Sequence, residues 1–134
     1  MSGAPSHFTS VESSGGVLVL AVNSHQLRDI AAVARFESEL RSLPQQHKEV
    51  VWLLDFGGTT FFVTPAANTL VAIMRGLRQR GGDLVLTGIS QDVRYVLRLL
   101  RLDNIFAIYP SAPKALQELG GNGHNLPGKA AEAG

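Results

Sequence analysis

Hydrophobic and polar positions change their spacing several times along the chain, and each change predicts a new element. Residues 7–12 and the apolar run 17–22 flank a glycine-containing turn, which predicts an N-terminal β-hairpin. From 26 to 43 the apolar residues recur at helical spacing, and Pro44 closes that helix. Its buried stripe is predicted to consist of Leu27, Ile30, Ala31, Ala34, Phe36, Leu40 and Leu43.

The remainder of the chain alternates apolar strands with amphipathic helices. The predicted strands are 50–54, 83–87 and 105–109, and the predicted helices are 65–80, 91–100 and a short last helix that Ser111 caps and that ends at Leu119. Such alternation implies βαβ crossovers and a largely parallel sheet. The fold class is therefore α/β, a mixed sheet of about five strands with an N-terminal antiparallel hairpin and about four helices packed on it. We expect one domain over residues 7–119, a flexible N-terminus over 1–6 and a disordered tail over 120–134.

Composition narrows the classes of function. Charged residues make up 17% of the chain and hydrophobic residues 45%, so the chain can bury a core. A net charge of +1 gives little electrostatic support for binding nucleic acid or an acidic membrane surface. There is no cysteine, no apolar run of roughly 18 residues and no secretory signal pattern. We expect a cytoplasmic protein without a nucleic-acid or membrane partner.

Residue types that carry catalysis or bind metals are not grouped in this sequence. The four histidines lack ligand spacing, and no carboxylate pair or nucleophile with a neighbouring base is evident, so we expect no catalytic residue, metal or cofactor. The pairs Gly57-Gly58 and Gly81-Gly82 do not form a phosphate-binding fingerprint and are interpreted as a turn and a helix end. Six arginines concentrate positive charge in two predicted helices. We interpret them first as a solvated helix face, then as a contact surface for a partner protein, and last as a nucleic-acid site. These arginines are Arg75, Arg78, Arg80, Arg94, Arg98 and Arg101.

The stretch 50–70 holds the two most informative polar residues. Asp55 ends a buried strand, where it can position a phosphate-bearing partner or bind a cation, or where it can simply accept N–H bonds from the glycine turn that follows. Thr64 precedes Pro65 at a helix start, which is typical of an N-cap followed by proline at the first helical position. The alternative is that Thr64 is a phosphoacceptor, because a phosphate there would add about two negative charges beside the positive end of a helix.

The order of these features resembles STAS domains (sulfate transporter and anti-sigma factor antagonist), and in particular bacterial anti-sigma factor antagonists. The resemblance covers about 16–119 and needs no gap between Asp55 and Gly82. The residues that carry it are Val51-Trp52-Leu53-Leu54-Asp55, Thr60-Phe61-Phe62, Arg80-Gly81-Gly82-Asp83-Leu84-Val85-Leu86-Thr87-Gly88-Ile89-Ser90, Val93, Arg94, Leu97 and Leu102-Asp103-Asn104-Ile105-Phe106.

This resemblance implies a regulatory module that binds an anti-sigma factor or serine/threonine kinase-type partner through the start of the second helix. Thr64 falls where the family's phosphorylated serine lies, while Val63, Pro65 and Ala66 replace the family's aspartate, second serine and glycine. The expected partner-binding residues are Asp55, Phe62, Val63, Thr64, Pro65 and Asn68. Two alternatives stay open. One is a phosphorylation-independent STAS scaffold or homo-oligomer subunit, and the other is a small-ligand or nucleotide-binding domain with Asp55 and Thr64 lining a pocket.

Overall fold

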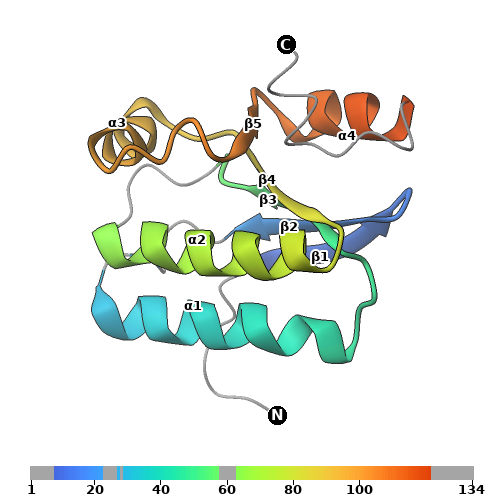
Figure 1. The fold of residues 1–134 in the computed structure, drawn as a ribbon, viewed down its shortest axis with the longest axis horizontal. Helices are drawn as coiled ribbons and strands as arrows, with labels where there is room; N and C mark the ends of the chain where they lie inside the picture. The colour runs from blue at the N-terminus through green and yellow to red at the C-terminus, as the bar shows by residue number, and fades with distance from the viewer. Residues whose placement is uncertain (1–7, 23–26, 28, 58–62, 122–134) are drawn as a thin grey trace.

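Five strands form one mixed sheet in the computed structural model, which describes residues 8–22, 27, 29–57 and 63–121 (Figure 1). The spatial order follows the sequence order, β1-β2-β3-β4-β5. β1 and β2 are antiparallel, whereas β2, β3, β4 and β5 are parallel to one another. The strands are β1 (Phe8–Ser14), β2 (Val17–Val22), β3 (Val51–Asp55), β4 (Asp83–Thr87) and β5 (Ala107–Tyr109). The predicted α/β class with its N-terminal hairpin is confirmed.

Helices connect the parallel strands, as the predicted alternation requires. The helices of the described chain are α1 (Ile30–Ser42), the 3-10 turn η2 (Leu43–Gln45), α2 (Thr64–Gln79), α3 (Gln91–Leu99) and α4 (Ala112–Gly121). Ser90 caps α3 by accepting the Val93 N–H at 3.1 Å, and Ser111 caps α4 by accepting the Lys114 N–H at 3.3 Å. β5 begins at Ala107, two residues later than predicted.

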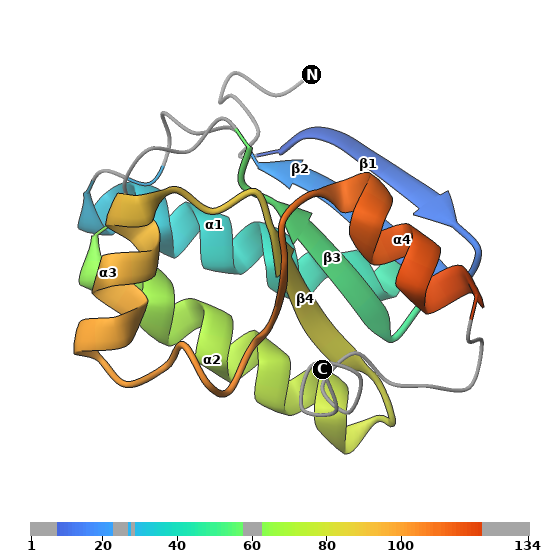
Figure 2. The same ribbon diagram turned by 90° about the horizontal axis from the view of Figure 1, so that it is seen from above.

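The two faces of the sheet are covered unequally (Figures 1 and 2). On one face the side chains of Leu20, Leu54 and Leu86 pack with those of α1, α2 and α3. On the other face Leu53 and Val85 pack with α4, the single helix of the described chain that lies there. Since alternate residues of a strand point to opposite faces, the central strands carry apolar side chains on both faces.

The hairpin turn depends on glycine. Gly15 and Gly16 have φ values of +58° and +85°. Residues with a side chain rarely adopt such values, which suit the tight turns that join antiparallel strands. The turn is therefore two residues long, and Ser13 and Ser14 belong to β1 rather than to the turn.

The predicted face of the first helix is wrong in part. The helix begins at Ile30, because the side chain of Asp29 accepts the Ala32 N–H at 2.8 Å and acts as the N-cap. Ile30 is 72% exposed, whereas Val33 is buried. Ala31 and Ala34 are exposed, while Ala32, Phe36 and Leu40 are buried as well. Leu27 is buried but lies before the helix. Counting the helical period from Leu27 therefore assigns the buried face of α1 to the wrong residues.

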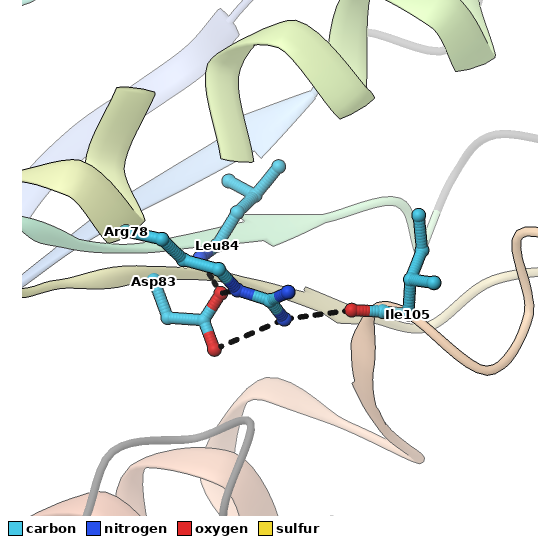
Figure 3. Close-up of polar contacts among 4 residues, drawn as sticks. All are labelled: Arg78, Asp83, Leu84 and Ile105. Carbon is cyan, nitrogen blue, oxygen red and sulfur yellow. Dashed lines mark hydrogen bonds and ion pairs between the residues drawn. The ribbon is translucent and has the colours of Figure 1, made fainter. Parts of the chain in front are cut away.

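The junction of α2 with β4 is tightly built (Figure 3). Gly81 has a φ of +88° and Gly82 donates to the Leu77 carbonyl at 2.8 Å, which confirms the predicted glycine helix end. Arg78 pairs with the buried Asp83, with 2.8 Å between Nε and Oδ1. The side chain of this arginine is 39% exposed, so it belongs to the solvated face of α2 and is at the same time tied to Asp83. None of the helices in the described ranges is long and apolar enough to cross a bilayer.

Candidate functional site: the start of helix α2

Asp55 ends β3 and has a defined structural task. Its Oδ1 accepts the Gly57 N–H at 3.0 Å, which is the turn contact expected of a carboxylate before a glycine. The backbone of Gly88 lies close to this oxygen. A Cβ added to Gly88 would lie 2.9 Å from it. Gly88 also has a φ of +66°, so glycine is required there on both grounds. Of the two interpretations of Asp55, the hydrogen bond to the turn is the one that the structure realises.

Thr64 occupies the first position of α2 rather than the cap. Val63 is the N-cap residue, with extended backbone at φ −78° and ψ 156°, and no side chain caps the helix. The Val63 carbonyl accepts the Ala66 N–H at 2.9 Å, so the helix begins one residue earlier than predicted. The prediction that Thr64 is the N-cap and Pro65 the first helical residue is therefore wrong. The Thr64 side chain is exposed.

The other predicted partner-binding residues are distributed around this helix start. Asn68, one turn after Thr64, is exposed, and Pro65 is half-buried. Val63 is half-buried as well, and its N–H donates to the Leu27 carbonyl at 3.2 Å. Phe62 lies outside the described residues. Thr64 and Asn68 therefore form an exposed surface at the start of α2, with the half-buried Val63 and Pro65 beside them.

Asp55 does not belong to that surface. In β3 the side chains of Trp52 and Leu54 join the core beneath α1, α2 and α3, whereas Leu53 joins the cluster beneath α4. By the same alternation Asp55 points to the α4 side of the sheet. Its neighbour in register on β4 is Thr87, which is fully buried. The predicted set is thus divided between the two faces of the sheet.

A groove lies beside the start of α2. It has a volume of about 310 Å³ and runs between α1 and α2. Its lining consists of Ile30, Val33, Ala34, Glu37, Pro65, Asn68, Thr69 and Ala72. Two of the predicted partner-binding residues therefore border an apolar depression. The sequence predicts that Ile30, at the rim of this groove, is buried, because its spacing matches the apolar stripe of the first helix. The structure shows that it is exposed.

Two buried hydroxyls on the α4 side have no hydrogen-bond partner. They belong to Thr87 on β4 and Tyr109 on β5, which are neighbours in register. Burial raises the pKa of Tyr109, and the negative charges of Glu118 and Asp83 act in the same direction. No group of three or more metal-ligating side chains occurs within the residues that the structure describes.

Comparison with known proteins gives one family and several structural neighbours. The STAS domain family model matches residues 8–115. A search among curated proteins found no significant match. Solved structures that are similar include an anti-sigma-factor antagonist (STAS) domain protein from Planctomyces limnophilus, with 20% identity and a TM-score of 0.72 over 82% of this chain and 96% of that chain.

Two further solved structures are similar to this chain. The anti-sigma factor antagonist SpoIIAA in its unphosphorylated form has 18% identity and a TM-score of 0.70, over 84% of this chain and 96% of its own. RsbS from Moorella thermoacetica, with a serine-to-glutamate substitution, has 21% identity and a TM-score of 0.67, over 85% and 98%. At these identities the neighbours establish the fold, and the family match extends over most of the chain. The chain belongs to the STAS domain family.

Proposed function

We propose that this protein is a non-enzymatic regulatory module of the anti-sigma factor antagonist type. It binds an anti-sigma factor or serine/threonine kinase-type partner protein in the cytoplasm. The contact surface is the start of α2, formed by Val63, Thr64, Pro65 and Asn68. The observation that carries this proposal is the exposure of Thr64 at the first helical position, where no hydrogen bond occupies its side chain as a cap.

Phosphorylation of Thr64 is the proposed control. A phosphate would place about two negative charges at the positive end of the helix dipole. Pro65 has no N–H, and the Ala66 N–H already donates to Val63, so the first turn offers few donors to hold a phosphate. The modification would therefore change the charge of the docking surface more than the stability of the helix.

Incubation with the kinase-type anti-sigma factors of the same genome and ATP tests the switch. Intact-mass spectrometry should show one added phosphate on the wild type and none on Thr64→Ala. The unmodified protein should bind the partner at least tenfold more tightly than Thr64→Glu, because a charge at a desolvated contact costs about 1.4 kcal/mol or more. No phosphate on Thr64 together with unchanged partner binding by Thr64→Glu would exclude the switch.

A scaffold or homo-oligomer that needs no phosphorylation is the second candidate. Its support is the apolar groove between α1 and α2, with Ile30 exposed at its rim. Sedimentation at increasing protein concentration tests it, with Ile30→Ser as the variant. Association that Ile30→Ser abolishes and that Thr64→Glu leaves intact would favour this candidate.

A small-ligand or nucleotide site that uses both Asp55 and Thr64 has less support. One oxygen of Asp55 is engaged by the Gly57 N–H, and its side chain faces the α4 side of the sheet. Thr64 belongs to the helix on the opposite face. Calorimetric titration with ATP and GTP provides the test, and binding that Asp55→Asn weakens would revive this candidate.

A further inference from the structure

Exposed apolar side chains concentrate on one short helix. Among the described residues, five large hydrophobic side chains are exposed, and three of them lie between positions 95 and 100. Tyr95 is 59% exposed and Leu99 is 63% exposed. Only Val93 and Leu97 of α3 are buried. At 3.6 residues per turn, Tyr95 points about 180° away from the direction midway between those two. The aromatic ring thus marks the solvent side of α3.

Arginines surround the exposed side chains of Tyr95 and Leu99. Arg94 and Arg98 precede and follow Tyr95 along the helix, and a groove of about 300 Å³ is lined by Gln91, Arg94, Tyr95 and Arg98. Among the residues that the structure describes, Arg94, Arg98 and Arg101 form no ion pair, whereas Arg41 and Arg78 each do. Three cations beside two exposed apolar side chains are therefore available to an acidic partner.

The end of α3 adds an independent observation. The Leu102 N–H donates to the Leu97 carbonyl at 2.8 Å and the Arg101 N–H to the Arg98 carbonyl at 3.0 Å, which is the bond pattern of a Schellman motif. The residue after the helix cap is then left-handed, and Arg101 has a φ of +59°. Every other positive-φ residue of the described chain is a glycine. Glycine adopts this conformation without strain, so arginine here opposes local stability and its side chain is a candidate for a functional role.

We propose that the α3 face, defined as Arg94, Tyr95, Arg98, Leu99 and Arg101, docks an acidic, partly apolar helix of a partner protein. Tyrosine and arginine are enriched among the residues that contribute most of the binding energy in protein–protein interfaces. The proposal does not rest on Thr64, although α3 lies next to the beginning of α2 in both views (Figures 1 and 2).

Other classes of partner fit this face less well. An amphipathic helix that lies in a membrane interface buries a broad apolar face, whereas α3 exposes Tyr95 and Leu99 with Asp92 also on the exposed side. A nucleic-acid surface is strongly basic as a whole, whereas this chain has a net charge of +1. An acidic helix with apolar side chains matches both the charge and the two apolar positions.

The test uses the full chain labelled with ¹⁵N and a synthetic helical peptide of about sixteen residues with glutamates flanking leucines on one face. Amide shifts should be confined to residues 91–102. The double variant Arg94→Gln/Arg98→Gln and the single variant Tyr95→Ala should each weaken binding about tenfold. Raising salt from about 0.05 to 0.5 M should weaken it as well. The matched control Arg35→Gln/Arg80→Gln removes the same charge from exposed sites on α1 and at the C-cap of α2, and it should leave the affinity unchanged.

Arg101→Gly separates stability from binding. Because glycine adopts a left-handed conformation without strain, the variant should unfold at a temperature equal to or above that of the wild type, yet bind the peptide more weakly. A glycine that leaves the affinity unchanged would overturn the role of Arg101. Three outcomes would overturn the whole proposal: equal loss of affinity in the control variant, tighter binding of phosphatidylglycerol vesicles or a single-stranded oligonucleotide to the same residues, or self-association that Tyr95→Ala abolishes.

Discussion

Replacing Arg78 by methionine removes a cation that holds three segments together. Its Nε lies 2.8 Å from Oδ1 of Asp83, and its Nη2 donates to the Ile105 carbonyl at 2.7 Å (Figure 3). The same Asp83 oxygen accepts the Leu84 N–H at 2.8 Å. Methionine keeps much of the apolar stem of arginine but offers no donor. The carboxylate of Asp83, 3% exposed, would then lose this counter-charge.

The size of the effect follows from this burial. Removing one partner of a buried ion pair costs about 3–5 kcal/mol, because a charge is left uncompensated away from water. The side chain of Arg78 is itself 39% exposed, so water replaces part of the lost interaction. We expect a loss of about 2 kcal/mol in the free energy of unfolding. For a domain of this size that corresponds to a fall in Tm of about 8 °C.

Urea and thermal unfolding followed by circular dichroism measure this loss. The matched control is Arg75→Met on the same helix, since Arg75 is exposed and forms no ion pair in the described structure. The control should change the stability by less than about 0.5 kcal/mol. In a double-mutant cycle with Asp83→Asn, the coupling energy should be about 1–2 kcal/mol. Equal effects of Arg78→Met and Arg75→Met, or additive effects in the cycle, would refute the reasoning.

Three further substitutions test the caps and the buried hydroxyl. Thr64→Ala should cost less than about 0.5 kcal/mol in chemical unfolding, since Thr64 is exposed and caps nothing. Ser90→Ala should cost about 1 kcal/mol in the same assay, because it leaves the Val93 N–H without its acceptor. Tyr109→Phe should keep or raise the Tm at pH 8, because it removes a buried hydroxyl that has no partner. Since burial holds the pKa of Tyr109 above its unfolded value of about 10, the folded state retains the proton that the unfolded state loses. Wild-type stability should therefore fall relative to Tyr109→Phe as the pH rises above about 10, and parallel pH profiles would contradict this.

Much of the fold could be predicted because its signals are local. The apolar strands β2, β3 and β4 and the glycines that end the hairpin and α2 each act over a few residues. The face of α1 could not be predicted as reliably. Leu27 lies before the helix, and its side chain is buried. Its backbone carbonyl accepts a hydrogen bond from the N–H of Val63, a residue far along the chain. Helical periodicity carries no information about such a long-range contact.

The candidate site likewise contains local contacts that the sequence can predict and long-range contacts that it cannot. The hydrogen bond between Asp55 and Gly57 was one of two interpretations available from the sequence, because it spans two residues. The position of Thr64 was predicted wrongly by one residue, because the extended backbone of Val63 supplies the helix start without a polar side chain. The pairing of Arg78 with Asp83 and the Ile105 carbonyl depends on how α2 meets the β5 segment, which no local pattern encodes.

The unequal covering of the sheet sets an order for folding during synthesis. The face beneath α1, α2 and α3 can close once those helices have left the ribosome, whereas Leu53 and Val85 stay open to water until α4 follows. Ala115 and Leu119 on that last helix are buried against them. A nascent chain that pauses before residue 112 therefore displays a half-finished sheet with one apolar face. That interval is when chaperones have a surface to hold and when neighbouring nascent chains are most prone to aggregate.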